Sequence, residues 1–358
     1  MARIKKMSAF VFLSILWIGS TLLGPMAAQS VRSMSFREDL SIGVREGGEN
    51  YMFGNTIMMN ADDQGNFYVT DWDRKHIRKF DSQGKYVFTI GKKGQGPGEF
   101  ANISVARFDR SGNIYVLDVS SRKIVTFGST GKFLNQRLFA DRFSDLQFTP
   151  GVTCLGIQSK VSEISGIPQI KEIYGIFDDQ FKPIVEFYSS TISPPPPPRP
   201  DPQALSESVS KSIFQPEPLY AMGSDGLIYY GFSDKYVIDV YAAEGKKIRT
   251  ISRECERLKI EKKDENDFFE NEWDNYVRYM PETIRNQVKR LIRFPENKPF
   301  FKRLVPMENG WLAVVVDFDR SGFALFDLFD KEGRFLGRCK AAVPTANLFF
   351  KNGKAYAV

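Results

Sequence analysis

MNADDQGNFYVTDWDRKHIRKFDSQGKYVFTIG (Met59–Gly91) is followed along the chain by a second stretch of the same design, VARFDRSGNIYVLDVSSRKIVTFGSTGKFLNQ (Val105–Gln136). Each stretch contains four short runs rich in aromatic and β-branched residues, separated by a Gly-Asn turn, a polar connection and a Gly-Lys turn. The turn glycines of the two stretches are 47 residues apart at both turns (Gly65 and Gly112, Gly84 and Gly131). This period is typical of a four-stranded propeller blade.

Fainter copies of the pattern follow at Phe148–Tyr188, Tyr220–Ile251 and Leu304–Leu336, which gives five units. The chain ends on the first half of a unit, NGKAYAV, and FREDLSIG near its start matches a second half. A ring of blades must not leave unpaired strand edges, so strands from both ends are expected to share one sheet. We therefore expect an all-β, six-bladed propeller in which Phe36–Ile42 and Lys354–Val358 lie in the same blade.

The glycine-rich segment IGKKGQGPGEF (Ile90–Phe100) raises the question of a phosphate-binding loop. Such a loop leads into a helix, whose N-terminal amides contact the anion. Here the following residues alternate between apolar and polar and read as a strand, and no Lys-Ser/Thr pair follows the last glycine. The segment is therefore expected to be a connection between two blades.

The stretches GKKGQGPGEF, DQGNFYVTDWDRKHIRKFD and SGNIYVLDVSSRKI resemble the NHL-repeat six-bladed β-propellers, especially a bacterial exported group. The sequence departs from the usual Asn-His-Arg-Ile connection of that repeat, because it reads Arg-Lys-His-Ile at 74–77. The resemblance implies the fold but says little about function, since related propellers include both enzymes and binding proteins.

Residues 1–28 read as a Sec-type signal peptide, with Arg3, Lys5 and Lys6 before an apolar run and small residues at Ala28. The alternative is a leader that is retained as an anchor. We expect an exported protein of the periplasm or the extracellular space, without a transmembrane span in the mature chain. The formal charge of +6 falls to about +3 without the leader, which does not favour a nucleic-acid partner.

Two insertions interrupt the repeat of the propeller, which is expected to span residues 31–358. Residues 189–218 contain five consecutive prolines and predict a solvated, extended loop. Residues 254–301 predict a helical insertion between the fourth and fifth blades: one stripe contains Phe269, Trp273, Tyr276, Val277 and Met280, and a second contains Ile284, Val288, Leu291 and Ile292. The stripes are expected to pack within the protein, and a lid that binds a partner or a membrane is the alternative.

Few residues are available for common catalytic chemistry. His76 is the only histidine, so a multi-histidine zinc site is impossible and a Ser-His-Asp triad could use only this residue. Cys154, Cys255 and Cys339 lack metal-site spacing, and Cys255 and Cys339 are expected on diverging outer strands, too far apart for a disulfide.

Propellers bind ligands at the mouth of the central channel, where loops from each blade meet. The ligand-binding candidates follow second strands: Asp71, Trp72, Asp73, Asp118, Asp317 and Asp319. Carboxylates in such an arrangement could hold Ca²⁺, but an Asp that recurs with the repeat is also suited to capping backbone amides within each blade.

We therefore predict a monomeric, exported, non-catalytic binding scaffold without a cofactor, whose ligand is a protein, a peptide or a glycan. The alternative is a hydrolase or lyase that depends on a divalent metal held by the aspartate cluster.

Overall fold

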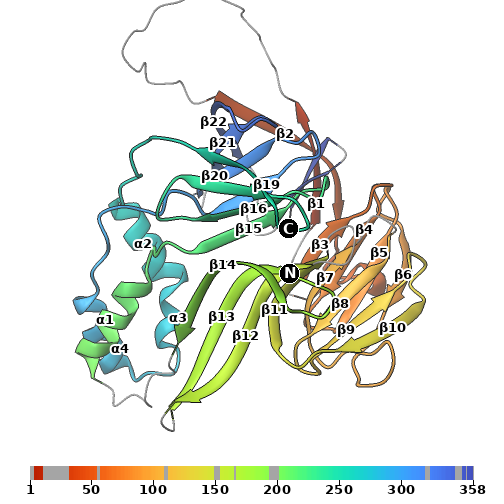
Figure 1. Ribbon diagram of the computed structural model, residues 1–358, viewed down its shortest axis with the longest axis horizontal. Helices are drawn as coiled ribbons and strands as arrows, with labels where there is room; N and C mark the ends of the chain where they lie inside the picture. The colour runs from red at the N-terminus through yellow and green to blue at the C-terminus, as the bar shows by residue number, and fades with distance from the viewer. Residues whose placement is uncertain are drawn as a thin grey trace, which may run out of the picture.

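The computed structural model describes residues 4–10, 32–54, 57–108, 112–148, 154–164, 167–192, 201–318, 323–342, 349–351 and 353–357. The chain forms an all-β propeller, and Figure 1 shows its small antiparallel sheets arranged around a common centre. A short 3-10 helix, η1 (Glu49–Tyr51), precedes the first blade.

The first four blades are separate sheets, each made of four consecutive antiparallel strands. The first blade contains β3 (Ile57–Ala61), β4 (Phe67–Asp71), β5 (His76–Phe80) and β6 (Tyr86–Ile90). The second contains β7 (Ile103–Phe108), β8 (Ile114–Asp118), β9 (Lys123–Phe127) and β10 (Phe133–Leu138). The third contains β11 (Arg142–Phe148), β12 (Cys154–Ile164), β13 (Ile167–Phe177) and β14 (Pro183–Ile192). The fourth contains β15 (Pro218–Met222), β16 (Ile228–Phe232), β17 (Val237–Tyr241) and β18 (Lys247–Ser252).

The fifth and sixth blades are joined in one eight-stranded sheet, because β22 and β2 pair in parallel. The fifth blade contains β19 (Arg303–Pro306), β20 (Leu312–Phe318), β21 (Phe323–Phe329) and β22 (Phe335–Ala342). The sixth is built from both ends of the chain and contains β23 (Phe349–Lys351), β24 (Lys354–Ala357), β1 (Ile4–Phe10) and β2 (Arg32–Ile42).

The expected closure of the ring by both chain ends is confirmed. Strands β2 and β24 lie in one sheet, although they do not pair directly: β1 lies between them, with Ile4 opposite Ile42 and Ser8 opposite Lys354. The sequence analysis places Ile4–Phe10 in a leader outside the fold, whereas the structure includes its backbone in the sixth blade. The leader itself stays a prediction.

Six clusters of buried side chains lie between successive blades and close the ring. Tyr68 of the first blade packs in one cluster with Ala106 of the second, and Leu155 of the third packs with Ile228 of the fourth. The last cluster joins the sixth blade to the first, where Tyr356 packs with Phe67 at a ring-centroid distance of 5.7 Å. The hydrophobic core is therefore divided among the interfaces between blades, as burial on both faces of each sheet requires.

Each blade presents two different ends. At the turn end of the first blade, tight turns at residues 61–67 and 80–86 join the first strand to the second and the third to the fourth. Gly65 and Gly84 adopt φ values of +80° and +82° there, which glycine reaches without a steric cost. At the crossover end of the first five blades, the second strand leads to the third, and the fourth strand leads to the next blade.

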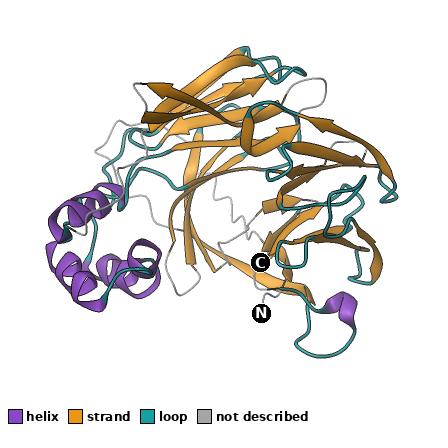
Figure 2. Ribbon diagram, turned by 90° about the horizontal axis from the view of Figure 1, so that it is seen from below, coloured by secondary structure: helices purple, strands orange, loops and turns teal. Residues whose placement is uncertain are grey.

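Both insertions leave the ring at the crossover end and pack against each other (Figures 1 and 2). Their helices are α1 (Pro202–Ser212), α2 (Lys262–Asn271), α3 (Trp273–Val277) and α4 (Glu282–Leu291). They share a cluster that contains Val209, Phe268, Trp273 and Val288. None of the helices in the described part of the chain is long and apolar enough to cross a membrane.

The helical insertion between the fourth and fifth blades is confirmed, but its details differ from the prediction. The first stripe spans two helices that meet at Glu272, and Phe268 is buried more deeply than Phe269. The 189–218 insertion contains α1 and not only a loop, because Asp201 caps the amides of Gln203 and Ala204 and starts a helix. The run of prolines within 193–200 lies outside the described residues.

Candidate functional site

Asp71 lies at the crossover end of the first blade, with its side chain fully buried. Its Oδ2 accepts a hydrogen bond from the amide of Gly54 at 2.9 Å, and its Oδ1 accepts one from the amide of Arg74 at 3.0 Å. The Arg74 guanidinium is 3.8 Å away. Asp71 thus ties the segment that precedes the first blade to the connection between its second and third strands.

Asp118 makes the same kind of contact in the second blade. It accepts hydrogen bonds from the amides of Ala101 at 2.7 Å and Asn102 at 3.1 Å, and from the amide and hydroxyl of Ser121. In the fourth blade, the hydroxyl of Ser233 accepts from the amide of Glu217 at 2.9 Å. The carboxylate oxygens of Asp71 and Asp118 are thus occupied by donors of the chain itself, which favours the capping role of these residues over the binding of a ligand.

The other candidates have different surroundings. Trp72 packs against the core between the first two blades, and its Nε1 donates a hydrogen bond to the carbonyl of Ser104 at 3.0 Å. The neighbouring Asp73 is exposed. Asp317 forms ion pairs with Lys298 at 2.7 Å and Lys302 at 2.8 Å. Asp319 lies outside the described residues.

The candidates are thus spread over three blades rather than gathered into one ligand set. Within the described ranges, no group of three or more His, Cys, Asp and Glu side chains is placed to hold a metal ion.

His76 lies opposite Asp71 in the first blade. Burial and the nearby Arg78 guanidinium lower the pKa of His76 to about 4. Its Nε2 atom is buried and has no hydrogen-bond partner among the described atoms. The three cysteines form no disulfide, and burial raises the pKa of Cys154 to about 12. At neutral pH the Cys154 thiol therefore stays protonated, the form that is a poor nucleophile.

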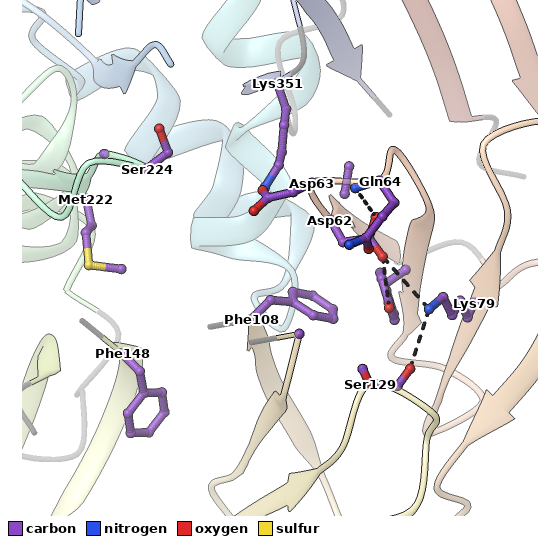
Figure 3. A pocket seen from close by; sticks show the side chains of 14 residues that line it. Asp62, Asp63, Gln64, Lys79, Phe108, Ser129, Phe148, Met222, Ser224 and Lys351 are labelled. Carbon is purple, nitrogen blue, oxygen red and sulfur yellow. Dashed lines mark hydrogen bonds and ion pairs between the residues drawn. The ribbon is translucent and has the colours of Figure 1, made fainter. Parts of the chain in front are cut away.

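A pocket of about 400 Å³, the turn-end pocket, lies at the other end of the channel (Figure 3). Five blades contribute to it, which places it near the axis of the ring. Its lining comes mainly from the turns between first and second strands: Ala61, Asp62, Asp63, Gln64, Tyr68, Lys79, Phe108, Gly112, Ser129, Phe148, Met222, Gly223, Ser224 and Lys351.

One wall of the turn-end pocket is charged. Asp62 accepts from the amides of Gln64 and Asn66 and from the hydroxyl of Tyr68, and Lys79 lies 3.8 Å from it. Burial and the Asp62 carboxylate raise the pKa of Tyr68 above its ordinary range. Lys351 pairs with Asp63 at 2.6 Å, and the Asp63 side chain is 67% exposed.

The apolar part of the lining comes from three blades and contains Phe108, Phe148 and Met222, all of them half-buried. Phe108 lies on the side of Asp62, and Phe148 and Met222 lie across the pocket from it (Figure 3). Phe108 packs on Tyr68 and Phe148 stacks on Tyr115, each with ring centroids 4.3 Å apart. These contacts leave the rings little freedom to move, so a ligand that packs on them would lose little side-chain entropy.

The turn-end pocket was not predicted, because the predicted ligand-binding residues all follow second strands, at the crossover end. One signal was present: Asp62 and Asp63 lie three and two positions before the turn glycine of the first blade, Gly65, and aromatic residues end the first strands of the second and third blades.

Comparison with known proteins agrees with the fold. The family DUF5128, described as a 6-bladed beta-propeller, matches residues 55–155. No curated protein sequence matches the chain.

Three solved structures illustrate the likeness. A protein named as exported, from Bacteroides fragilis, has 15% identity and a TM-score of 0.48, over 82% of this chain and 73% of that one. A member of the DUF4221 family from Bacteroides vulgatus has 11% identity and a TM-score of 0.43, over 84% and 90%. Virginiamycin B lyase from Staphylococcus aureus has 10% identity and a TM-score of 0.37, over 82% and 72%. All three TM-scores are below 0.5. Residues 55–155, in the first three blades, are similar to a family described as six-bladed β-propellers.

Proposed function

We propose that this protein is an exported, non-catalytic binding scaffold and that the turn-end pocket takes a segment of a peptide or protein ligand. The observation that carries the proposal is the pairing of an apolar wall with a charged wall inside one pocket at the channel axis. Export rests on the composition of residues 1–28.

A peptide fits the two walls better than a purely apolar small molecule. An apolar side chain of the ligand would pack on Phe108 and Phe148, and a neighbouring charge would contact Asp63 or Lys351. The ion pair between Asp63 and Lys351 is largely exposed on the Asp63 side, and such pairs contribute little to stability. A charged group of the ligand can therefore replace one partner at small cost.

The placement of reactive groups supports binding without catalysis. The carboxylate of Asp62 holds its own turn through several hydrogen bonds. The single histidine lies at the crossover end of the strands, away from the turn-end pocket. Asp62 accepts a hydrogen bond from the Tyr68 hydroxyl, but burial and the Asp62 carboxylate hold the pKa of Tyr68 above its ordinary range, so this hydroxyl is not activated as a nucleophile at neutral pH.

The test is selection of peptides from a random displayed library on the immobilised full chain, followed by affinity measurement. We expect enriched peptides with an aromatic or aliphatic residue next to a charged one. Phe148→Ala should weaken their binding about tenfold or more, since burial of a Phe is worth about 1.5–3 kcal/mol.

Leu138→Ala is the matched control, because Leu138 is 72% exposed on an outer strand. A failure to enrich any sequence, or equal affinity of Phe148→Ala and wild type, would contradict the proposal. Cleavage of a selected peptide by the wild type would instead identify an enzyme.

A further inference from the structure

A second pocket, the crossover pocket, lies at the crossover end between the second and third blades and has a volume of about 570 Å³. Its lining contains two arginines and four serines but no acidic residue: Ser104, Val119, Ser120, Arg122, Arg142, Phe143, Ser144 and Ser159. This composition differs from the mixed charges of the turn-end pocket.

Both arginines are exposed at the pocket and are not neutralised. Arg142 begins β11, opposite Ser159 of β12. Arg122 lies in the connection between β8 and β9, and its guanidinium has only a long contact, 3.4 Å, to the carbonyl of Ala140. Within the described residues, neither guanidinium forms an ion pair.

The backbone around Arg122 is fixed although its side chain is exposed. Its φ is +48°, a conformation that is uncommon for a residue other than glycine, and its carbonyl accepts a hydrogen bond from the amide of Phe139 at 3.1 Å. The buried ring of Phe143 forms part of the pocket lining and packs on Phe139. The two arginines therefore project from a rigid base at the junction of two blades.

The acidic side chains nearest in sequence are engaged elsewhere. Asp118 accepts hydrogen bonds from backbone amides, and Asp145 is held by Arg107 at 3.2 Å and by the hydroxyl of Tyr220 at 2.9 Å. Asp141 accepts from Gln158 at 3.0 Å and lies 3.9 Å from Lys160. None of these carboxylates lines the crossover pocket, so the charged groups of its lining are the two guanidinium groups, and the serine hydroxyls add neutral donors.

We propose that the crossover pocket binds a ligand through an oxyanion group, such as a sulfate, a phosphate or a carboxylate. Guanidinium groups bind oxyanions through two parallel, charge-assisted hydrogen bonds, and the hydroxyls of Ser120 and Ser144 can supply further donors. The volume of about 570 Å³ exceeds what one inorganic anion needs, so the pocket has room for an oxyanion that is one substituent of a larger molecule.

The experiment is calorimetric titration of the full chain with sodium sulfate, sodium phosphate and sodium glucuronate at constant ionic strength. We expect saturable binding of at least one anion, weakened about tenfold by Arg122→Gln or Arg142→Gln and lost in the double variant, because each change removes one charged donor fork. The ranking of the three anions identifies whether the natural substituent is a sulfate, a phosphate or a carboxylate.

Two controls make the outcome specific. Arg290→Gln removes an exposed charge from α4, and Phe148→Ala alters the turn-end pocket; neither should change anion binding. Arg122→Gln keeps a side chain at the positive φ, so it adds no new backbone strain, and an unchanged melting temperature shows that the variants fold. Absence of saturable binding for all three anions, or equal binding by the double variant, would overturn the proposal.

Discussion

The second and fifth blades use an aspartate near the end of the second strand in different ways. In the second blade, Asp118 accepts hydrogen bonds from the backbone amides of Ala101 and Asn102, which belong to the connection from the first blade. In the fifth blade, Asp317 pairs with the ammonium groups of Lys298 and Lys302, which belong to the connection from the fourth blade. In the connection that contains α2, α3 and α4, long side chains thus take over a contact that backbone amides make in the first and second blades.

The difference changes what each contact does for the fold. Asp118 holds the connection from the first blade and the connection between β8 and β9, whereas Lys298 also pairs with Asp264 at 2.7 Å, in the first turn of α2. Lys298 is only 3% exposed and bridges the helical insertion to the ring. Burial by itself would raise the pKa of Asp317, but Lys302 and Lys298 outweigh it and hold this pKa below its ordinary value.

The largest effect is expected for Asp118→Ala. The change leaves the amides of Ala101, Asn102 and Ser121 without their acceptor, and each buried unsatisfied donor costs about 1–3 kcal/mol, so the loss should be ~4 kcal/mol in all. Urea unfolding followed by circular dichroism measures it. Asp179→Ala, at an exposed turn residue, should change stability by less than about 0.5 kcal/mol. Equal stability of the two variants would show that the Asp118 contacts do not matter.

The blades and their closure could be predicted because the relevant signals are local in sequence. Gly65 and Gly112 mark turns that need a positive φ, and the strands around them are short and apolar. The recurring Asp71 and Asp118 were also found, with capping as one of two interpretations. The break at Glu272 between α2 and α3 could not be predicted, because the apolar residues on both sides of it keep one helical period.

The repeat period alone predicts neither pocket. The turn-end pocket brings together Asp63, Phe148 and Lys351, which lie on three different blades and share no motif. The crossover pocket depends on the register that places Arg142 opposite Ser159. Such sites depend on how the blades are placed around the ring, which the period alone does not determine.

The next largest loss of stability is expected when Lys298, which pairs with Asp317 of the fifth blade and with Asp264 of α2, is replaced. Lys298→Met leaves Asp264 and Asp317 without their shared cation, and loss of one partner from a buried ion pair costs about 3 kcal/mol. We expect faster hydrogen exchange in α2 than in β8, because the insertion loosens from the ring first. Mass spectrometry of exchanged peptides measures both segments.

Lys302→Met is the matched control, since it leaves the Lys298 bridge in place. Equal acceleration of α2 and β8 in Lys298→Met would mean that the bridge supports the whole ring and not the insertion alone.

The smallest effect is a loss of stability at acid pH that arises in the first blade and not in the second. The two blades differ at the residue opposite the capping aspartate. His76 lies opposite Asp71, and Lys123 lies opposite Asp118. The pKa of His76 is about 4 in the folded chain, below its ordinary value of 6.5, because of burial and then Arg78. As the pH falls below 6.5, the unfolded chain therefore binds a proton before the folded chain does.

The stability that neutral His76 contributes is thus complete above pH 6.5 and is lost progressively towards pH 4. After allowance for the partial exposure of His76, we expect the free energy of unfolding of the wild type to fall by about 1–2 kcal/mol between pH 6.5 and pH 4. The fall should be smaller in His76→Gln. Because the chain has one histidine, its imidazole resonances follow the titration directly by NMR. A midpoint near 6.5 would mean that water reaches the ring freely, and the two blades would then not differ in their response to acid at this position.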